Sequence, residues 1–150
     1  MENVDEIVAK SFYYFGSGYN CSESILLAIA KDSFGLDTDL IPKIATGFGG
    51  GISRQGHVCG AVSGAVMGFG LKYGRTNPEE LRAKTYNRVV QFFKQFQKEF
   101  GSILCKELSG CDLSTIEGIR KFREDDVHEK RCRYLVTGAL KIFTNLINET

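Results

Sequence analysis

The feature that most constrains this chain is the spacing of its apolar residues, which recur mainly three and four positions apart. That spacing gathers apolar side chains on one face of a helix, so it predicts amphipathic α-helices rather than strands. Only two prolines interrupt the 150 residues, and helices can therefore extend over most of the chain. The pattern predicts an all-α fold, a compact single-domain bundle of about five to seven helices over residues 1–150.

Glycine stops and N-cap residues divide the apolar pattern into separate helices. Asn20, with Glu23 three residues later, is a capping-box sequence. Asn77 followed by Pro78 is the clearest helix start, and Gly101 stops that helix. The expected helices cover residues 4–15, 20–33, 38–46, 57–73, 77–100, a short segment after residue 114, and 125–148.

A glycine-rich segment, GFGGGISRQG, lies at residues 47–56, directly before the fourth expected helix. Glycine allows positive φ and close approach of the backbone to another group. Within the helix, Gly60, Gly64 and Gly68 recur every four residues, although each costs up to about 1 kcal/mol relative to alanine. We therefore expect this helix to be central and closely approached by another helix, in the same chain or across a dimer.

The charge balance excludes one class of partner. Lys and Arg number 19 against 18 for Asp and Glu, a net charge of +1, which argues against a nucleic-acid binder that relies on a basic field. No apolar run reaches the roughly 18–20 residues that span a bilayer, and the first ten residues lack the apolar stretch of a signal peptide. We expect no nucleic acid, no membrane insertion and a cytoplasmic location.

Five cysteines without a secretory signal favour metal ligands or redox thiols over structural disulfides. The alternative is that each packs as a small buried hydrophobe. Cys21, Cys59 and Cys105 fall at predicted helix starts, where free N–H groups stabilise a thiolate and should lower the thiol pKa. The thiolate both reacts and binds metal, so Cys59, directly after the glycine segment, is the leading nucleophile or ligand.

Cys132 has a different setting, between Arg131 and Arg133, whose charges also favour a thiolate. His128, four residues earlier, shares its helix face and is either a second ligand or a solvated member of a charged run. His57 is interpreted as a helix-start residue. No CxxC occurs, which argues against a thioredoxin-like dithiol and against ordinary zinc fingers.

Two further features carry weaker signals. Cys111 is a weak candidate metal ligand. Gly51 to Gly56 matches the GxxxxG spacing of a P-loop, but His57 and Val58 stand where Lys and Ser or Thr are needed. Nucleotide binding is therefore disfavoured, while a small anion held by the loop amides and Arg54 stays open.

Several of these motifs together resemble a known family. Cys21, GFGGG with CGAVSGAVMGFGL, Cys105 and Cys132 are similar to the redox-active proteins named for their C…GCAxxG…C…C pattern, over the stretch from Asn20 to Tyr134. The family name has Gly before the cysteine where this chain has Val58, whereas CGAVSG fits a CGAxxG form. Four functional cysteines are implied, at positions 21, 59, 105 and 132, with Cys111 as an extra.

The resemblance also carries expectations about cofactor and partners. It implies association with transporter loci and, through the related split-Soret cytochrome c type, a helical homodimer with an iron–sulfur centre. This chain has no CxxCH, so covalent haem is not implied. The resemblance supplies no substrate.

We therefore predict a redox-active cysteine protein whose cysteines act in electron or sulfur transfer, either as a dithiol/disulfide or as an iron–sulfur or other metal site, with a redox partner or transporter component. Whether it turns over as an enzyme stays open. The alternatives are a non-catalytic helical dimer that binds a small ligand or a transporter, and a purely structural helical protein. The residues expected to surround a cofactor are Gly49, Gly50, Gly51, Gly60 and Gly64.

Overall fold

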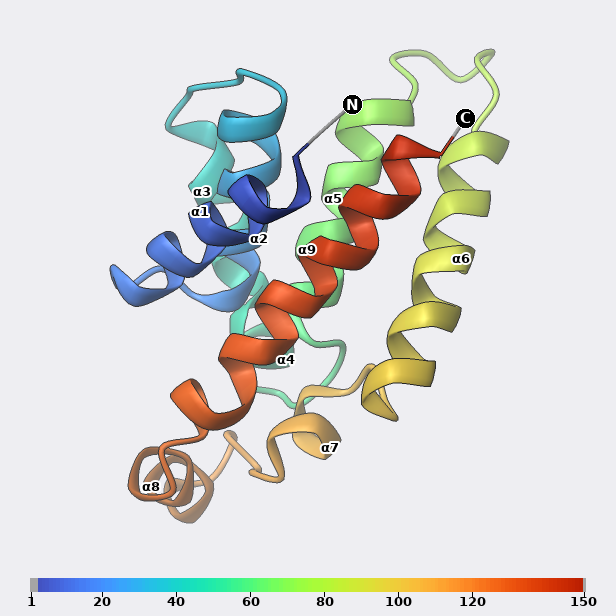
Figure 1. Ribbon diagram of the computed structural model, residues 1–150. Coiled ribbons are helices and arrows are strands. Elements are labelled where there is room, and N and C mark those ends of the chain that lie inside the picture. The colour runs from blue at the N-terminus through green and yellow to red at the C-terminus, as the bar shows by residue number, and fades with distance from the viewer. Residues whose placement is uncertain (1–2, 150) are drawn as a thin grey trace.

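The computed structural model describes residues 3–149, and helices dominate that range (Figure 1). The α-helices are α1 (Val4–Gly16), α2 (Cys21–Leu27), α3 (Leu40–Ala45), α4 (Gly49–Ile52), α5 (Gly60–Tyr73), α6 (Ala83–Phe100), α7 (Cys105–Ser109), α8 (Ile116–Glu124) and α9 (Arg133–Asn148). The predicted all-α class is confirmed; residues 1, 2 and 150 of the predicted domain lie outside the described range. No helix between residues 3 and 149 has the length and apolar character needed to cross a membrane.

The core lies between α5 and α9, which run side by side through the middle of the molecule (Figure 1). α6 packs against both from one side, and α1 and α2 cover the other. Aromatic rings fill the centre: Phe69 of α5 lies 4.6 Å from Phe143 of α9 and 5.9 Å from Phe92 of α6, between ring centroids. Because all three rings are at most 1% exposed, they fix α5 rigidly between its neighbours.

The glycine ridge of α5 is the surface on which α2 packs. A Cβ at Gly64 would lie 2.8 Å from Ile25 Cβ and 3.0 Å from the Ser22 carbonyl oxygen, and real Cβ atoms do not tolerate the first of these separations. The prediction of a close helix approach is confirmed, and the approaching helix belongs to the same chain. The predicted homodimer stays a prediction without support from this ridge.

The capping box predicted at Asn20 and Glu23 is present at the start of α2. The Asn20 side chain accepts a hydrogen bond from the Glu23 N–H at 2.9 Å, and the Glu23 carboxylate accepts one from the Asn20 N–H at 2.9 Å. This capping box makes Cys21 the first residue of the helix. Beyond Leu27 the helix continues as a π-helical segment, Ala28–Ser33.

The predicted start of the fifth helix at Asn77 and Pro78 is wrong, because α6 begins at Ala83. Asn77 instead caps a turn, accepting a hydrogen bond from the backbone N–H two residues on, and the Arg75 guanidinium donates to the Pro78 carbonyl at 2.8 Å. Leu81 in this segment is 86% exposed. Without an apolar face to bury, the segment gains nothing from joining the helix.

Two other helices begin later than the sequence suggests. α5 begins at Gly60 rather than His57, since residues 57–59 are extended and pair with another segment. The last helix is preceded by a π-helical turn, His128–Cys132, and Asp126 before it has a φ of +52°. Cys132 is therefore the N-cap of α9.

Candidate functional site

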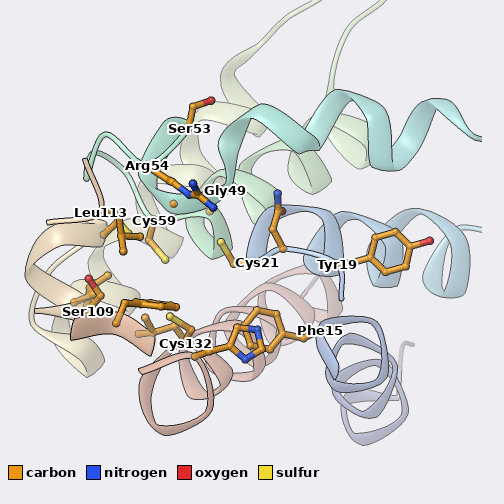
Figure 2. Close-up of a pocket in the computed structure, with 18 of the residues that line it drawn as sticks. Phe15, Tyr19, Cys21, Gly49, Ser53, Arg54, Cys59, Ser109, Leu113 and Cys132 are labelled. Carbon is orange, nitrogen blue, oxygen red and sulfur yellow. The ribbon is translucent and has the colours of Figure 1, made fainter. Parts of the chain in front are cut away.

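Four of the five cysteines line one cavity of about 600 Å³ at the end of the bundle where α4, α7 and α8 lie (Figures 1 and 2). They come from four separate segments, each at a helix start, and are called the cavity cysteines below. Cys21 is the first residue of α2, Cys59 precedes α5, Cys105 is the first residue of α7 and Cys132 precedes α9. The tertiary fold thus assembles a thiol site that no close sequence pair could form.

A short antiparallel pairing of two extended segments brings Cys59 near Cys105. Val58 and Leu104 form an isolated bridge. The Cys59 N–H donates to the Ile103 carbonyl at 2.8 Å, and the Cys105 N–H donates to the His57 carbonyl at 2.7 Å. These backbone bonds fix both cysteines while leaving their side chains free to face the cavity.

Cys21 is held by contacts with the backbone of two other segments. Its sulfur lies where a Cβ at position 60 would stand, so only glycine fits there. The backbone N–H groups of Gly50, Ser22 and Gly60 act on the thiol in the direction that favours its charged form. The first glycine of CGAVSG therefore serves the site directly, by admitting the Cys21 sulfur.

The glycine-rich segment forms a left-handed turn beside the cavity. Gly50 and Gly51 have φ of +69° and +67°, and Ile52, Ser53 and Arg54 continue with +65°, +51° and +68°. A positive φ is unfavourable for non-glycine residues and most of all for a β-branched one. The surrounding structure must enforce this turn, which places Ser53 and Arg54 at the cavity.

The five glycines predicted to surround a cofactor divide into two groups. Gly49, Gly50 and Gly60 line the cavity. Gly51 instead packs against His57 and Cys105, where a Cβ would lie 2.7 Å from the His57 nitrogen, and Gly64 packs against α2. The second pair thus shapes the walls without reaching the interior of the cavity.

Cys111 does not line the cavity. It is 2% exposed and packs with Leu113 and Val127 in a small cluster behind Cys105 and Cys132. This position accords with the sequence view that Cys111 is an extra, and it makes this residue a matched control for the cavity cysteines.

Only one of the two histidines lies at the cavity. His128 lines the cavity, whereas His57 does not. The His128 ring stacks on Phe15, with centroids 4.0 Å apart and planes 9° apart, and its Nδ1 lies 3.5 Å from a Glu129 carboxylate oxygen. The π-helical turn of His128–Cys132 places both of its end residues at the cavity.

Sequence reasoning missed two residues of the site. Ser109 lines the cavity and is 4% exposed; its hydroxyl is hydrogen-bonded to the backbone of Cys111 and acts to lower the pKa of the Cys105 thiol. Phe15 supplies the surface on which His128 stacks. Neither belongs to a local motif, because each acts through contacts between distant segments.

The expected lowering of the thiol pKa values is wrong. Burial raises the pKa of Cys105 to about 11 and of Cys132 to about 12, and it raises the pKa of Cys21 and Cys59 as well. Neighbouring thiols act in the same direction on Cys59, Cys105 and Cys132, because a second thiolate would repel the first. Helix-start N–H groups oppose the shift without reversing it.

These raised pKa values predict a loss of stability at high pH. The ordinary thiol pKa is 9.0, and that of Cys105 is about 11 in the fold. Between these values the unfolded chain has released a proton that the folded chain retains, so rising pH favours unfolding. In urea titrations of the reduced, metal-free protein, the free energy of unfolding should fall across this window.

A variant with Cys105→Ala and Cys132→Ala provides the control for this pH dependence. Lysine and tyrosine titrations are common to both proteins, so the difference between the two slopes isolates the thiols. The variant should lose less stability over the window. Equal slopes would contradict the raised thiol pKa values.

The cysteines and their described neighbours do not form a compact metal-binding group. Between residues 3 and 149 no three His, Cys, Asp or Glu side chains are gathered closely enough to hold a metal ion. No disulfide joins the cysteines either. Among the described residues the cavity cysteines are therefore free thiols that share a cavity without forming a compact ligand group.

The chain was compared with known proteins. The sequence profile of the family described as "Putative redox-active protein (C_GCAxxG_C_C)" matches residues 19–146, a range that contains every cysteine. A protein of Archaeoglobus fulgidus described as "Uncharacterized protein" is 29% identical over 134 residues, which cover 83% of this chain and 88% of the relative. No solved structure matches significantly.

Proposed function

Because this chain belongs to the C_GCAxxG_C_C family, described as redox-active, we propose that its cavity cysteines are a redox site that holds an iron–sulfur cluster. The observation that carries the proposal is the convergence of four cysteine side chains from four segments on one cavity. Four thiolates are the usual protein ligands of such clusters. When bound, the cluster supplies one-electron transfer.

The size of the cavity supports a cluster over a single ion. A cluster distributes its ligands over several irons, so its cysteines stand farther apart than those around one zinc ion. The cavity of about 600 Å³ is also much larger than one ion requires. A cluster therefore accounts for four cysteines that share a cavity of this size.

The surroundings of the thiols favour a negatively charged occupant. The N-terminal end of α5, with its partial positive charge, lies at the cavity through Cys59, and the π-helical turn that leads into α9 begins at the cavity with His128. Metal cations would compensate the charge that burial otherwise penalises, so the cavity cysteines would bind them as thiolates. Cys59, 5% exposed and fixed by backbone bonds on both sides, would be the most rigid ligand.

A dithiol/disulfide pair is the second candidate, favoured by the backbone pairing that brings Cys59 and Cys105 together. Forming that disulfide would release two electrons and two protons to an acceptor. The raised pKa of both thiols opposes it, since the thiolate is the attacking form. The cluster is therefore the form that the geometry supports better.

Anaerobic reconstitution with ferrous iron and sulfide tests the proposal. Bound iron and sulfide in equal amounts, with visible absorption that bleaches on reduction by dithionite, would support it. Iron and sulfide that are both removed by desalting would overturn the cluster. In that case, a loss of two free thiols on mild oxidation, mapped to Cys59 and Cys105, would identify the disulfide form instead.

A further inference from the structure

We infer that the cavity also binds a small anion through Arg54, an inference that rests on the proposed role of the cavity thiols. Arg54 lines the cavity, and Figure 2 shows its guanidinium directed toward the space beside Cys21 and Cys59. The same side chain makes no ion pair and no side-chain hydrogen bond among the described residues. Its charge is thus available to a ligand.

The left-handed turn determines the orientation of the Arg54 side chain. The Arg54 stem folds back over Gly50, where a Cβ would lie 3.1 Å from Arg54 Cγ. Arg54 itself has a φ of +68°, a conformation that a long side chain adopts only when its surroundings enforce it. Glycine at position 50 and the strained backbone together place the guanidinium beside the cavity, where Arg54 stays exposed to solvent.

The charges around the cavity are complementary to an anion. No Asp or Glu is among the described residues that line it, and the polar ones are hydroxyl, amide, imidazole and guanidinium groups. Two carboxylates lie behind lining residues and are held by other groups. Glu23 accepts hydrogen bonds from the Thr46 hydroxyl and the Asn20 N–H, and Glu129 lies 3.5 Å from His128 Nδ1. An anion entering the cavity therefore meets the Arg54 guanidinium and no carboxylate among the described residues of the lining itself.

The ligand class follows from this pairing of guanidinium and thiols. Arg54 recognises a planar or tetrahedral oxyanion, such as a carboxylate, phosphate or sulfur oxyanion, and the rest of a small molecule then lies against the cavity sulfurs. The ligand is therefore a small oxyanion-bearing molecule that reaches the thiol site with its charged group at Arg54.

Two alkylating reagents of nearly equal size test this inference on the reduced, metal-free full chain. Iodoacetate is anionic and iodoacetamide is neutral; each forms a carbon–sulfur bond with a cysteine thiolate and releases iodide. Any effect of Arg54 on the thiolate fraction acts on both, so the ratio of the two rates isolates anion recognition. Arg54→Gln should lower the iodoacetate-to-iodoacetamide ratio at the cavity cysteines by about five-fold, the factor expected of one partly exposed ion pair.

Three controls accompany this measurement. Arg54→Lys should keep most of the ratio, and Lys98→Gln, which removes one charge at the exposed end of α6 away from the cavity, should leave it unchanged. Peptide mass spectrometry should find Cys111 unlabelled in every variant, which reports that the fold is intact. An unchanged ratio in Arg54→Gln, or an equal fall in Lys98→Gln, would overturn the inference.

A competition experiment identifies the charged group. Acetate, phosphate or sulfate should slow iodoacetamide labelling of the wild-type cavity cysteines more than chloride of equal ionic strength, and should not do so in Arg54→Gln. The anion effective at the lowest concentration indicates the head group of the ligand. Slowing no greater than that by chloride for all three would contradict the inferred site. Neither experiment depends on iron binding, so its failure is distinguishable from failure of the proposed cluster.

Discussion

Replacing Cys59 with serine or alanine should abolish the bound iron and the visible absorption of the reconstituted protein. Cys59 is the most buried of the cavity cysteines, and its backbone is fixed on both sides by hydrogen bonds. No other thiol can move into its place without breaking them. Loss of an outer partner of a metal ligand costs about 10–100-fold in affinity, and loss of the ligand itself should cost at least as much.

Cys111→Ser is the matched control for this prediction. Cys111 is as buried as Cys59 but lies outside the cavity, so its variant should retain iron and sulfide. Far-UV circular dichroism should show both variants folded. Full iron retention in Cys59→Ala, or equal loss in Cys111→Ser, would contradict the assignment of the four cavity cysteines.

Gly64→Ala should destabilise the protein by a net of about 1–2 kcal/mol, even though alanine is the better helix former. The added methyl group would stand 2.8 Å from Ile25 Cβ and 3.0 Å from the Ser22 carbonyl oxygen. The Ser22 carbonyl is part of the backbone of α2 and cannot move alone, so α2 must shift as a unit. The free energy of unfolding in urea measures the effect.

Gly70→Ala is the same chemical change on the same helix with the opposite expected sign. A Cβ at Gly70 would meet no atom within 4 Å, so the variant should gain about 0.5–1 kcal/mol from reduced freedom of the unfolded chain. Because α2 begins with Cys21, we also expect Gly64→Ala, but not Gly70→Ala, to weaken iron retention. Equal stability of the two variants would contradict the close packing of α2 on α5.

The sequence predicted the elements well wherever local contacts decide them. The capping box at Asn20, the glycine ridge of α5 and the apolar face of the last helix follow from residues within one or two turns of each other. The start at Asn77 and Pro78 failed because the same local signals also suit a capped turn, and a helix there would bury no apolar face.

The prediction that the thiol pKa values are lowered failed for a different reason. The position of a cysteine at a helix start can be read locally, and its effect on a thiolate is favourable. Burial acts in the opposite direction and is stronger here. No local pattern states how deeply a side chain will lie, so only the smaller of the two opposing effects could be predicted from local sequence.

The sequence by itself determined that helices form, where most of them begin, and that cysteines stand at those beginnings, because capping and periodicity act over a few neighbouring residues. The tertiary structure alone decided that four of these cysteines share one cavity, that Cys111 is excluded from it, and that Arg54 lies beside it. Those outcomes depend on contacts between α2, α5, α7 and α9, which lie far apart in the chain and meet only when the common core is packed.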